Sequence, residues 1–403
     1  MRVLLVGSGG REHALGWKLA RSPRVTELIS LPGNPGLAEL GPVVEGIDGS
    51  DVGAISAMAR VHGVDLVVVG PEGPLAAGLT DAVARLGIPV FGPTRAAARL
   101  ESSKAFAKEV MTRAGVATAG AERFTDPEPA KSHLDSHDGP YVVKADGLAG
   151  GKGVLVTDSK ADARSWVDHW IGEGPVVIED FLDGPEVSVF AVCTDSGAVA
   201  LEPARDYKRL LEGDDGPNTG GMGSYSPVAD LPPDLVDDTM ARVVRPTLAQ
   251  MEDDGNPFRG FLYAGMVLTD EGPKVLEFNV RLGDPETQAI IPRLENDLVD
   301  VLEGASPEWS GHATVNVVLA AGGYPTAPEM GAEIRGLDRR LGEDVIVFHA
   351  GTVAEGKKVF VDGGRVLSVV GIGEDVEMAR DRAYEAAERI SWPGVQYRRD
   401  IAL

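Results

Sequence analysis

The 403-residue sequence has little cysteine, few basic residues and no long hydrophobic run. Its one cysteine, Cys193, lies in an alternating apolar stretch and is expected to be a small buried residue. No disulfide can form within the chain, which fits the reducing cytosol. No apolar run approaches membrane-spanning length, and the first residues become glycine-rich too soon for a signal peptide. We therefore expect a cytoplasmic protein with no membrane partner.

Basic residues are outnumbered, because 38 Lys and Arg face 62 Asp and Glu and give a net charge of −24. Such a balance argues against nucleic-acid binding and against anionic membrane surfaces. Anionic small substrates are still compatible with it, since a local basic pocket can hold them. The length predicts two or three domains rather than a single core.

The first hundred residues alternate apolar runs with amphipathic segments. Strands are expected at residues 3–6, 66–69 and 89–91, and helices at 12–21 and 80–86. Apolar strands interleaved with helices predict a parallel sheet covered on both sides, and such sheets bind ligands at the carboxyl ends of their strands. The glycine-rich segments 7–11, 32–36 and 70–72 lie at or near those ends.

The rest of the chain divides by composition. A helix is expected from Glu101 to Ala114 with Gly115 as its stop, followed by a small strand-rich unit at 116–184 and a larger mixed unit to about residue 303. Residues 306–309 are typical of a linker. The tail predicts strands at 314–320, 345–349, 359–361 and 365–370 and a helix at 376–390. Because the tail has no dense polar cluster, we expect it to be structural.

The segment 274–282 is the most informative, because it alternates like a strand. One face carries Leu276, Phe278, Val280 and Leu282 and predicts a core. The other face carries Glu277, Asn279 and Arg281. Hard oxygen ligands suit Mg²⁺, which is usually held by few protein groups plus substrate phosphates, and an arginine suits a phosphoryl group in transit. A simpler interpretation is a solvated strand face on which Glu277 and Arg281 pair.

Two glycine-rich segments predict phosphate contacts. The segment 7–12 departs from a dinucleotide fingerprint because Glu12 takes the place of the third glycine, so a single phosphate near Arg11 is favoured over NAD. A turn without a ligand is the alternative. The segment 141–156 predicts two strands joined by a glycine hairpin that can cover a triphosphate, with Lys144 entering the loop. It is no Walker A loop, since Gly153 stands where Ser or Thr is required.

Two further segments are weaker signals. An apolar strand at 176–179 runs into an acidic turn, where backbone groups could contact adenine and Glu186 the ribose. The segment 214–225 is too dense in glycine for a regular element and predicts a functional loop. Next to it, Asp206 and Lys208 share a face if that stretch is extended, and we interpret them as substrate contacts; a solvated ion pair is the alternative.

These motifs, taken in order, resemble the ATP-grasp ligases, and most closely the phosphoribosylamine–glycine ligase family of purine synthesis. The resemblance runs from residue 7 to residue 288 and is carried by GSGGREHAL, LPGNPG, ESSK, VKADGLAGGKGV, EDFLDGPE, GPNTGGMGSYSP and LEFNVRLGDPETQ. Tyr207 stands where a histidine is usual and Leu282 where a phenylalanine is usual. The resemblance implies an α/β and α+β multidomain fold. Its expected parts are a Rossmann-like N-terminal domain (1–102), an ATP-grasp domain (103–303) with a lid (about 116–184), and a small α+β C-terminal domain (304–403).

The resemblance also implies a site. It implies catalytic roles for Arg281, Lys144 and Asp206, and a divalent metal, Mg²⁺ or Mn²⁺, at Glu277 and Asn279. ATP would be bound by Lys104, Lys144, Gly150, Gly151, Gly153, Glu179, Asp180, Phe181, Leu182 and Glu186. Glycine and 5-phosphoribosylamine would be bound by Gly9, Arg11, Glu12, Asn34, Gly36, Glu72, Asp206, Lys208, Asn218, Gly220, Gly221, Met222, Gly223, Arg281 and Asp284.

The expected reaction is the ATP-dependent joining of glycine to phosphoribosylamine through a glycyl phosphate, by a monomer with small-molecule partners only. Another ATP-grasp purine ligase using formate or bicarbonate is the nearest alternative. A nicotinamide oxidoreductase and a non-catalytic nucleotide-binding module are the others. Glu12, at the third glycine position, weakens the oxidoreductase alternative. A non-catalytic nucleotide-binding module has no need of the face bearing Glu277, Asn279 and Arg281.

Overall fold

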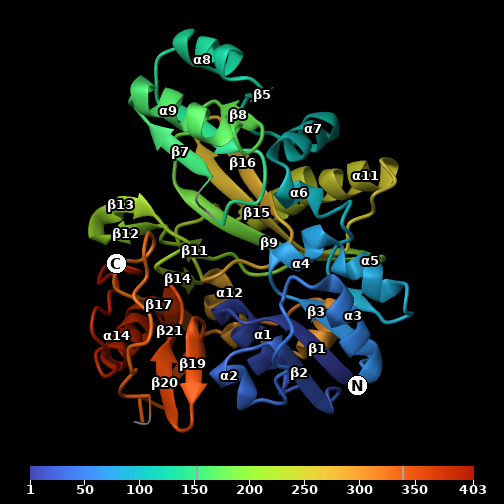
Figure 1. Cartoon of the computed structure of the whole chain (residues 1–403), viewed down its shortest axis with the longest axis vertical. Coiled ribbons are helices and arrows are strands. Elements are labelled where there is room, and N and C mark those ends of the chain that lie inside the picture. Colours follow the sequence, from blue (N-terminus) through green and yellow to red (C-terminus); the bar gives the residue numbers. More distant parts are fainter. Residues whose placement is uncertain (151–152, 338–339) are drawn as a thin grey trace.

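The computed structural model describes residues 1–150, 153–337 and 340–403. Figure 1 shows a central sheet with a separate lobe of two helices and a sheet above it, and with the two ends of the chain below it. Within the described residues, no helix is both long and apolar enough to span a bilayer. The mixture of a parallel sheet with several antiparallel sheets agrees with the expected α/β and α+β class.

The N-terminal unit is built on a parallel sheet of strand order β2-β1-β3-β4. Its elements are β1 (Arg2–Gly7), α1 (Gly10–Leu19), β2 (Glu27–Pro32), α2 (Pro35–Ala38), α3 (Val52–Val61), β3 (Leu66–Val69), α4 (Glu72–Ala77), α5 (Leu79–Ala84) and β4 (Val90–Phe91). The apolar runs of β1 and β3 are buried on both faces, as their lack of alternation predicts. Strand β2 and helix α3 were not predicted.

A helical connection leads into the lid, the lobe at the top of Figure 1. Its elements are α6 (Arg99–Ser102), α7 (Lys104–Ala114), β5 (Ala121–Phe124), α8 (Pro127–Asp135), β6 (Tyr141–Ala145), β7 (Val154–Thr157), α9 (Lys160–Ile171) and β8 (Val176–Glu179). Ser103 caps α7 by accepting from Phe106 N, and Gly115 ends it with φ of 68°. Strands β6 and β7 form the predicted antiparallel hairpin in a sheet of order β5-β8-β6-β7.

The central sheet has the order β10-β9-β15-β16 and is antiparallel. Its elements and the helices around it are β9 (Glu186–Thr194), β10 (Gly197–Ala200), α10 (Leu235–Thr239), the π-helix η2 (Met240–Val244), α11 (Arg245–Asp253), β15 (Gly260–Thr269), β16 (Gly272–Asn279), α12 (Glu286–Ile290), η3 (Ile291–Arg293) and α13 (Leu298–Leu302). Cys193 lies in β9 at 1% exposure, as expected of a small apolar residue.

One predicted core residue is corrected in β16. The pairing with β15 shifts register between Gly265 and Met266, which produces a bulge. The bulge breaks the alternation, so Val275 is fully buried while Leu276 is only half-buried. Phe278 is buried as predicted, and so are Val280 and Leu282, which follow the strand's end.

The C-terminal sheet has the order β11-β14-β17-β21-β18 and joins residues from both sides of position 303. Its elements and the hairpins near it are β11 (Arg205–Asp206), β12 (Arg209–Leu211), η1 (Glu212–Asp214), β13 (Asp215–Asn218), β14 (Gly223–Ser226), β17 (Ala313–Ala320), β18 (Val345–His349), β19 (Thr352–Glu355), β20 (Lys358–Val361), β21 (Arg365–Gly373) and α14 (Val376–Ala387).

The prediction that 214–225 forms no regular element was therefore wrong. Strand β13 pairs with β12 across a bulge, and β14 pairs with β17 over four residues. Position 223 in β14 requires a glycine, because the first side-chain carbon of any other residue would lie 2.7 Å from Asn316 O. The glycines permit close strand packing rather than preventing strands.

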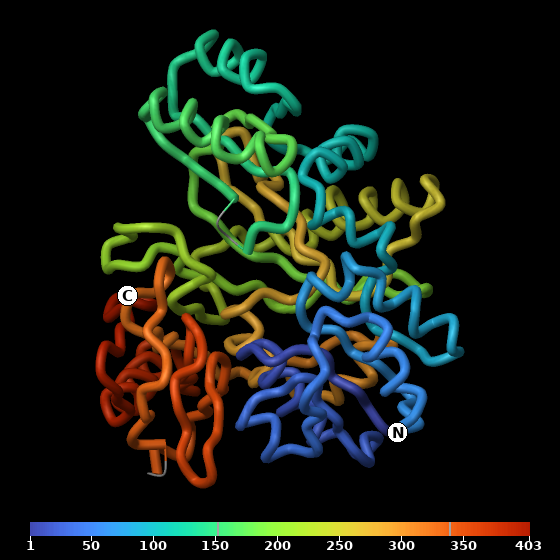
Figure 2. The backbone as a smooth tube through the Cα atoms, viewed as in Figure 1, coloured from blue at the N-terminus to red at the C-terminus, as the bar shows by residue number. Residues whose placement is uncertain are grey.

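The N-terminal and C-terminal units lie side by side below the central sheet, as the blue and the orange-to-red segments of Figure 2 show. Asn34 Nδ2 donates to His349 O, and His349 N donates to the ring nitrogen Nδ1 of His13. The rings of His13 and Phe348 meet edge to face, with centroids 5.3 Å apart. Helix α12 packs against α1 and also contacts β14 and β17, so it links all three parts.

Candidate active site

Three polar residues expected on one face of a strand do lie together at the end of β16. Asn279 Nδ2 donates to Glu277 Oε1 at 3.3 Å, and Arg281 Nη2 donates to Asn279 Oδ1 at 3.1 Å. The simpler interpretation required an ion pair between Arg281 and Glu277, and Arg281 pairs with other acids instead. Its ion pairs are with Glu72 at 3.1 Å and with Glu101 at 3.0 Å. The face is thus a shielded polar cluster, with the Arg281 side chain 17% exposed.

Glu277 lies among lysines from three different segments. Burial favours the neutral carboxyl, but the charges of Lys144, Lys208 and Lys104 outweigh it and lower the pKa of Glu277. Burial also lowers the pKa of Lys104, whose ammonium donates to Gly147 O at 3.1 Å. An ionised carboxylate amid several ammonium groups is an arrangement suited to phosphates together with a metal ion.

Lys144 is held by Glu179, one of the residues expected at the adenine. Lys144 Nζ lies 2.9 Å from Glu179 Oε2 and Lys108 Nζ lies 3.0 Å from the same oxygen, with Glu179 5% exposed. The Glu179 side chain therefore orients two lysines, and only its backbone is free to contact a base. Lys108 was missed, although it follows Lys104 by four residues on one helix, which puts both ammonium groups on one face.

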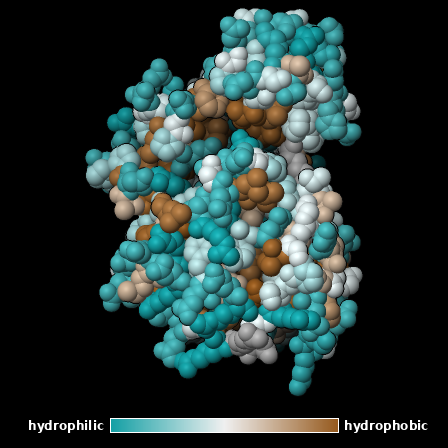
Figure 3. Space-filling model, turned by 90° about the vertical axis from the view of Figure 1, so that its left-hand side faces the viewer, coloured by the Kyte–Doolittle hydropathy of each residue, from teal (hydrophilic) through white to brown (hydrophobic). Residues whose placement is uncertain are grey.

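The glycine hairpin and the acidic turn form the outer wall of this region. Gly150 is exposed with φ of 56°, whereas Gly153 is buried and accepts from Ala145 N. Gly151, also predicted here, lies outside the described residues. In the turn after β8, Asp180 and Phe181 are exposed, Phe181 by 42%, and Leu182 is half-buried. Figure 3 shows the surface hollowed below the lid, with hydrophobic side chains gathered there.

Asp206 and Lys208 do lie together, and they connect the two halves of the site. Lys208 Nζ is 3.7 Å from Asp206 Oδ1 and forms an ion pair with Glu186, the residue expected at the ribose. Burial raises the pKa of Asp206 to about 7, against the opposing charge of Lys208. A carboxyl that ionises near neutral pH next to a cation can accept or release a proton during a reaction.

The segment Gly220 to Gly223 is positioned by the C-terminal unit, which was expected to be only structural. Arg365 Nη1 donates to Gly220 O and to Asp284 O, each at 2.6 Å, and Tyr324 Oη accepts from Gly220 N at 2.9 Å. That expectation was wrong, because one arginine and one tyrosine of the tail fix the glycine loop and the turn after β16. Nothing in their sequence surroundings marks either residue.

The other residues predicted in this loop differ in place. Met222 is fully buried, and a side chain at Gly221, with φ of 113°, would meet Pro285 at 2.4 Å. Asn218 is exposed and pairs in register with Arg209. Asp284 accepts from Arg11 N and from Gln288, and the charges of Arg365 and Arg11 lower its pKa against the effect of burial.

The predicted N-terminal residues are engaged with one another. Arg11 Nε donates to Glu12 at 2.6 Å and its Nη1 to Leu282 O at 2.9 Å, while Glu12 also accepts from Gly9 N. Asn34 caps α2 through Leu37 N and donates to Ser8 O, and Gly36 leaves room for the ring of His13. These residues shape the wall next to Arg281, and Glu72 is the one that contacts it.

The oxygens of Glu277 and Asn279 fit a divalent metal. Within the described residues, no group of three or more His, Cys, Asp or Glu side chains is arranged to hold a metal. Two adjacent hard oxygen donors beside lysines match Mg²⁺ or Mn²⁺, which take most of their remaining ligands from phosphates and water.

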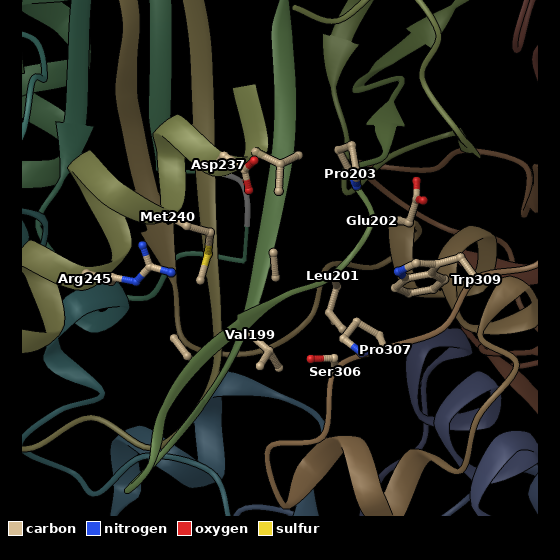
Figure 4. Close-up of a pocket in the computed structure, with 13 residues that line it drawn as sticks. Val199, Leu201, Glu202, Pro203, Asp237, Met240, Arg245, Ser306, Pro307 and Trp309 are labelled. Atoms are coloured by element: carbon tan, nitrogen blue, oxygen red, sulfur yellow. The ribbon is translucent and has the colours of Figure 1, made fainter. Parts of the chain in front are cut away.

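A pocket of about 540 Å³ lies elsewhere, and none of the predicted site residues lines it. Figure 4 shows Met240 of η2 and Arg245 of α11 facing Val199 and Leu201 across the pocket. Trp309 lies on its far side. The pocket borders β10, the edge strand of the central sheet, so it is separate from the polar cluster at Glu277.

Comparisons with known proteins agree over the full length. Three descriptions match: "Phosphoribosylglycinamide synthetase, N domain" over residues 1–101, its "ATP-grasp (A) domain" over 102–287, and its "C domain" over 314–403. A phosphoribosylamine–glycine ligase of Streptomyces coelicolor is 50% identical, with 100% of this chain and 99% of that one covered.

Solved structures give the same result. The crystal structure of a phosphoribosylamine–glycine ligase from Thermotoga maritima has a TM-score of 0.87 and 40% identity, with both chains fully covered. The biotin carboxylase domain of the Hydrogenobacter thermophilus 2-oxoglutarate carboxylase, in complex with MgADP, ADP and bicarbonate, has a TM-score of 0.74 at 18% identity, covering 98% of this chain and 91% of that one. This second likeness concerns the fold alone.

Proposed function

This chain belongs to the phosphoribosylglycinamide synthetase family, and from that premise we propose that it ligates glycine to 5-phosphoribosylamine. The products are glycinamide ribonucleotide, ADP and phosphate, in the synthesis of purines. The protein is an ATP-dependent carbon–nitrogen ligase of the ATP-grasp type, so it uses ATP and a divalent metal ion.

The observation that carries the proposal is the position of Glu277. This carboxylate bonds to Asn279 on one side and lies amid Lys104, Lys144 and Lys208, which together lower its pKa. Next to it, Arg281 is held by two acids. Lysines for phosphates, oxygens for a metal and a guanidinium for a transferred phosphoryl group are the parts that carboxylate activation by ATP requires.

In the first step the glycine carboxylate attacks the γ-phosphorus of ATP, and ADP leaves. Lys104 and Lys144 bind phosphate oxygens, and Arg281 offsets the charge that spreads over the transferred group. Glu277 and Asn279 would hold the metal ion, which would neutralise part of the charge on the phosphates. We propose Mg²⁺, with Mn²⁺ as a substitute. The product of this step is glycyl phosphate.

In the second step the amine of phosphoribosylamine attacks the carbonyl carbon and phosphate leaves, which forms the amide. The attacking nitrogen loses a proton, and Asp206 is the residue we propose to accept it, since burial holds its pKa near neutrality. No serine or cysteine nucleophile is needed. Because water would hydrolyse the acyl phosphate, the lid that carries Lys144 is expected to close over the site during turnover.

The remaining residue assignments form part of the proposal. The residues proposed to bind ATP are those expected from the sequence together with Lys108. The residues proposed for the substrates are those expected from the sequence together with Arg365. The domain limits are proposed at 102/103 and 303/304, with the small lid at about 116–184. A monomer that works in the cytoplasm on small molecules is also proposed, and sedimentation and cell fractionation test these two points.

A phosphate-release assay tests the function directly. Phosphate should appear only when ATP, glycine, phosphoribosylamine and Mg²⁺ are all present, and glycinamide ribonucleotide should accumulate in equal amount. Omission of each component in turn should stop product formation. Replacement of glycine by formate or bicarbonate with equal rates would assign the chain to another purine ligase and refute the proposal.

A further inference from the structure

Glu286 is a buried carboxylate that the mechanism above does not use. It is 3% exposed, and among the residues that the structure describes no Lys, Arg or His nitrogen lies within the ion-pair distance of 4 Å. Its Oε1 lies 3.3 Å from Ser188 Oγ, and no described donor bonds to its Oε2. Arg281 and Arg365 feel the charge of Glu286 but make no direct ion pair with it, and a buried carboxylate without a direct partner makes a cationic ligand a natural one.

The carboxylates around it are already matched. Glu72 and Glu101 pair with Arg281, Asp284 lies 3.5 Å from Arg365, and Asp206 lies 3.7 Å from Lys208. In the part of the site that the structure describes, Glu277 shares with Glu286 the lack of an ion pair, and Glu277 has the metal as its proposed partner. Glu286 is therefore the acidic group that is left to bind one further positive charge.

The position of Glu286 fits the ammonium group of an amino acid. Its charge raises the pKa of Arg281 and also that of Asp206, so it lies near both the proposed phosphoryl-binding residue and the proposed proton-accepting residue. A side chain at Gly283 would meet Glu286 Oε2 at 2.4 Å, so the glycine there makes room for the carboxylate. Glycine carries its ammonium one carbon from the carboxylate that must reach ATP.

A chain of hydroxyl groups keeps Glu286 in its acceptor role. Ser188 Oγ lies 2.7 Å from Tyr263 Oη as well as 3.3 Å from Glu286 Oε1. The one hydroxyl proton of Ser188 can be donated to Tyr263 or to Glu286, and when it is donated to Glu286 the Tyr263 hydroxyl can donate to Ser188 in turn. Tyr263 pairs in register with Asn279, which ties this chain to the metal-binding strand.

We infer that Glu286 binds the α-ammonium group of glycine and, with Ser188 and Tyr263 behind it, selects an amino acid over a simple carboxylic acid. The inference rests on the proposed function, because it names the contact for one of that reaction's substrates. Glu286 is a specificity-determining residue that touches the substrate without taking part in bond formation.

The test compares glycine with acetate, which has the same carboxylate and no ammonium. Hydroxylamine serves as the acceptor amine, so that either acyl phosphate is trapped as a hydroxamate and counted. In the full-length protein, Glu286→Gln should lower kcat/KM for glycine roughly 30-fold or more and leave that for acetate nearly unchanged. The glycine-to-acetate ratio should fall by the same factor, while KM for ATP stays within about twofold of the wild-type value.

Controls separate specificity from structure. Glu286→Asp, which keeps the charge, should recover part of the ratio, and Glu252→Gln, at an exposed position, should behave as wild type. A purely structural role would lower both substrates equally and leave the ratio unchanged, and that result overturns the inference. If Glu286→Gln does not fold, Ser188→Ala decides: a rise of a few-fold in KM for glycine alone supports the inference, and an unchanged KM overturns it.

The failure of the inference differs from failure of the function. If the wild-type chain forms no glycinamide ribonucleotide from ATP, glycine and phosphoribosylamine, the proposed function falls and the inference with it. If the wild-type chain works and the variant keeps the wild-type glycine-to-acetate ratio, the inference alone is wrong.

Discussion

The two sides of the candidate site, which we call the nucleotide side and the substrate side, differ in their balance of charges. On the nucleotide side, Lys108 and Lys144 share the carboxylate of Glu179, and the charges of Lys104 and Lys144 act on Glu277. On the substrate side, the guanidinium of Arg281 lies near three acids, Glu72, Glu101 and Glu286. A polyanion with its metal fits the first balance, and a substrate that brings its own ammonium fits the second.

This contrast shows how a strongly acidic protein can bind a triphosphate. The net charge of −24 describes the whole chain, whereas the binding surface is set by a few lysines brought together from α7, β6 and the segment after β11. The substrate side also shows burial at work, since burial raises the pKa of Glu101 to about 7 despite its ion pair with Arg281.

The largest effect is expected where the two balances meet, at Glu277. Glu277→Gln should lower turnover by about three orders of magnitude, because it removes the carboxylate proposed to bind the metal and one negative charge from among three lysines. Initial rates over a wide range of Mg²⁺ concentrations measure this, with Glu252→Gln as the exposed control. Unchanged rates at every Mg²⁺ concentration would rule out a metal at this residue.

Next in size is the loss of the proposed proton acceptor. Asp206→Asn should lower kcat roughly 100-fold or more. In the wild type, kcat should rise with pH through about 7, because Asp206 accepts a proton only when ionised and burial places its pKa there. The variant should lack this rise. A pH profile of kcat that keeps the same inflection in Asp206→Asn contradicts the role.

The nucleotide side alone is tested by Lys144. Lys144→Met should raise KM for ATP by about 10- to 100-fold, because a buried ammonium bonded to Glu179 is lost next to the phosphates. KM for glycine should change little. Lys131→Met is the matched control, since Lys131 lies in the same lid but pairs with Glu128 and Asp168 at its surface. Equal effects on both substrates would mean that the two halves are not separate.

Local patterns were sufficient for much of the fold. Strands with uninterrupted apolar runs, such as Leu66–Val69 and Val176–Glu179, were predicted to the residue, because burial on both faces leaves a clear signal. The hairpin that enters at Tyr141 and the helix capped by Ser103 were predictable from turn and cap chemistry. The bulge at Gly265 was not, because it depends on how β15 and β16 pair.

Prediction of the site succeeded where motifs are dense and failed where single residues act at a distance. Alternation placed Glu277, Asn279 and Arg281 on one face, the other motifs favoured a functional role for that face, and the structure joins the three residues by hydrogen bonds. Glu101 lies 180 residues before Arg281 with an ordinary helical neighbourhood, and Arg365 follows the linker in a strand of the tail. Such partners are set by the packing of distant elements: the ESSK motif that contains Glu101 does not reveal its pairing with Arg281, and none of the quoted motifs contains Arg365.

A smaller effect is expected from Arg365, which acts on the substrate side through backbone carbonyls. Arg365→Ala should raise KM for phosphoribosylamine or glycine by about 10-fold, because Gly220 O and Asp284 O lose a charged donor and the loop loosens. KM for ATP should stay near the wild-type value. Arg389→Ala, which removes an exposed arginine from the same C-terminal unit, is the control. A larger effect on ATP would contradict the division of the cleft.

The smallest effect concerns a third region, around His13 and His349, where burial disfavours a positive charge on the imidazole rings. Burial, followed by the neighbouring His349, lowers the pKa of His13 to about 3, and burial lowers that of His349 to about 4. Below pH 6.5 the unfolded chain binds protons at these rings and the folded chain does not, so the free energy of unfolding falls as the pH is lowered. The raised pKa values of Asp206 and Glu101 act in the opposite sense, since below about pH 7 the folded chain holds those protons more tightly.

The difference between wild type and His13→Asn isolates the histidine part of that balance. Relative to the variant, the wild type should lose about 1 to 2 kcal/mol of unfolding free energy between pH 7 and pH 5, as urea denaturation at each pH would measure. At pH 7.5 the kinetic constants for ATP should be the same in both, because His13 contacts the C-terminal unit and not the lysine cluster. A pH dependence identical in the two proteins would mean that His13 is no less basic when folded than when unfolded.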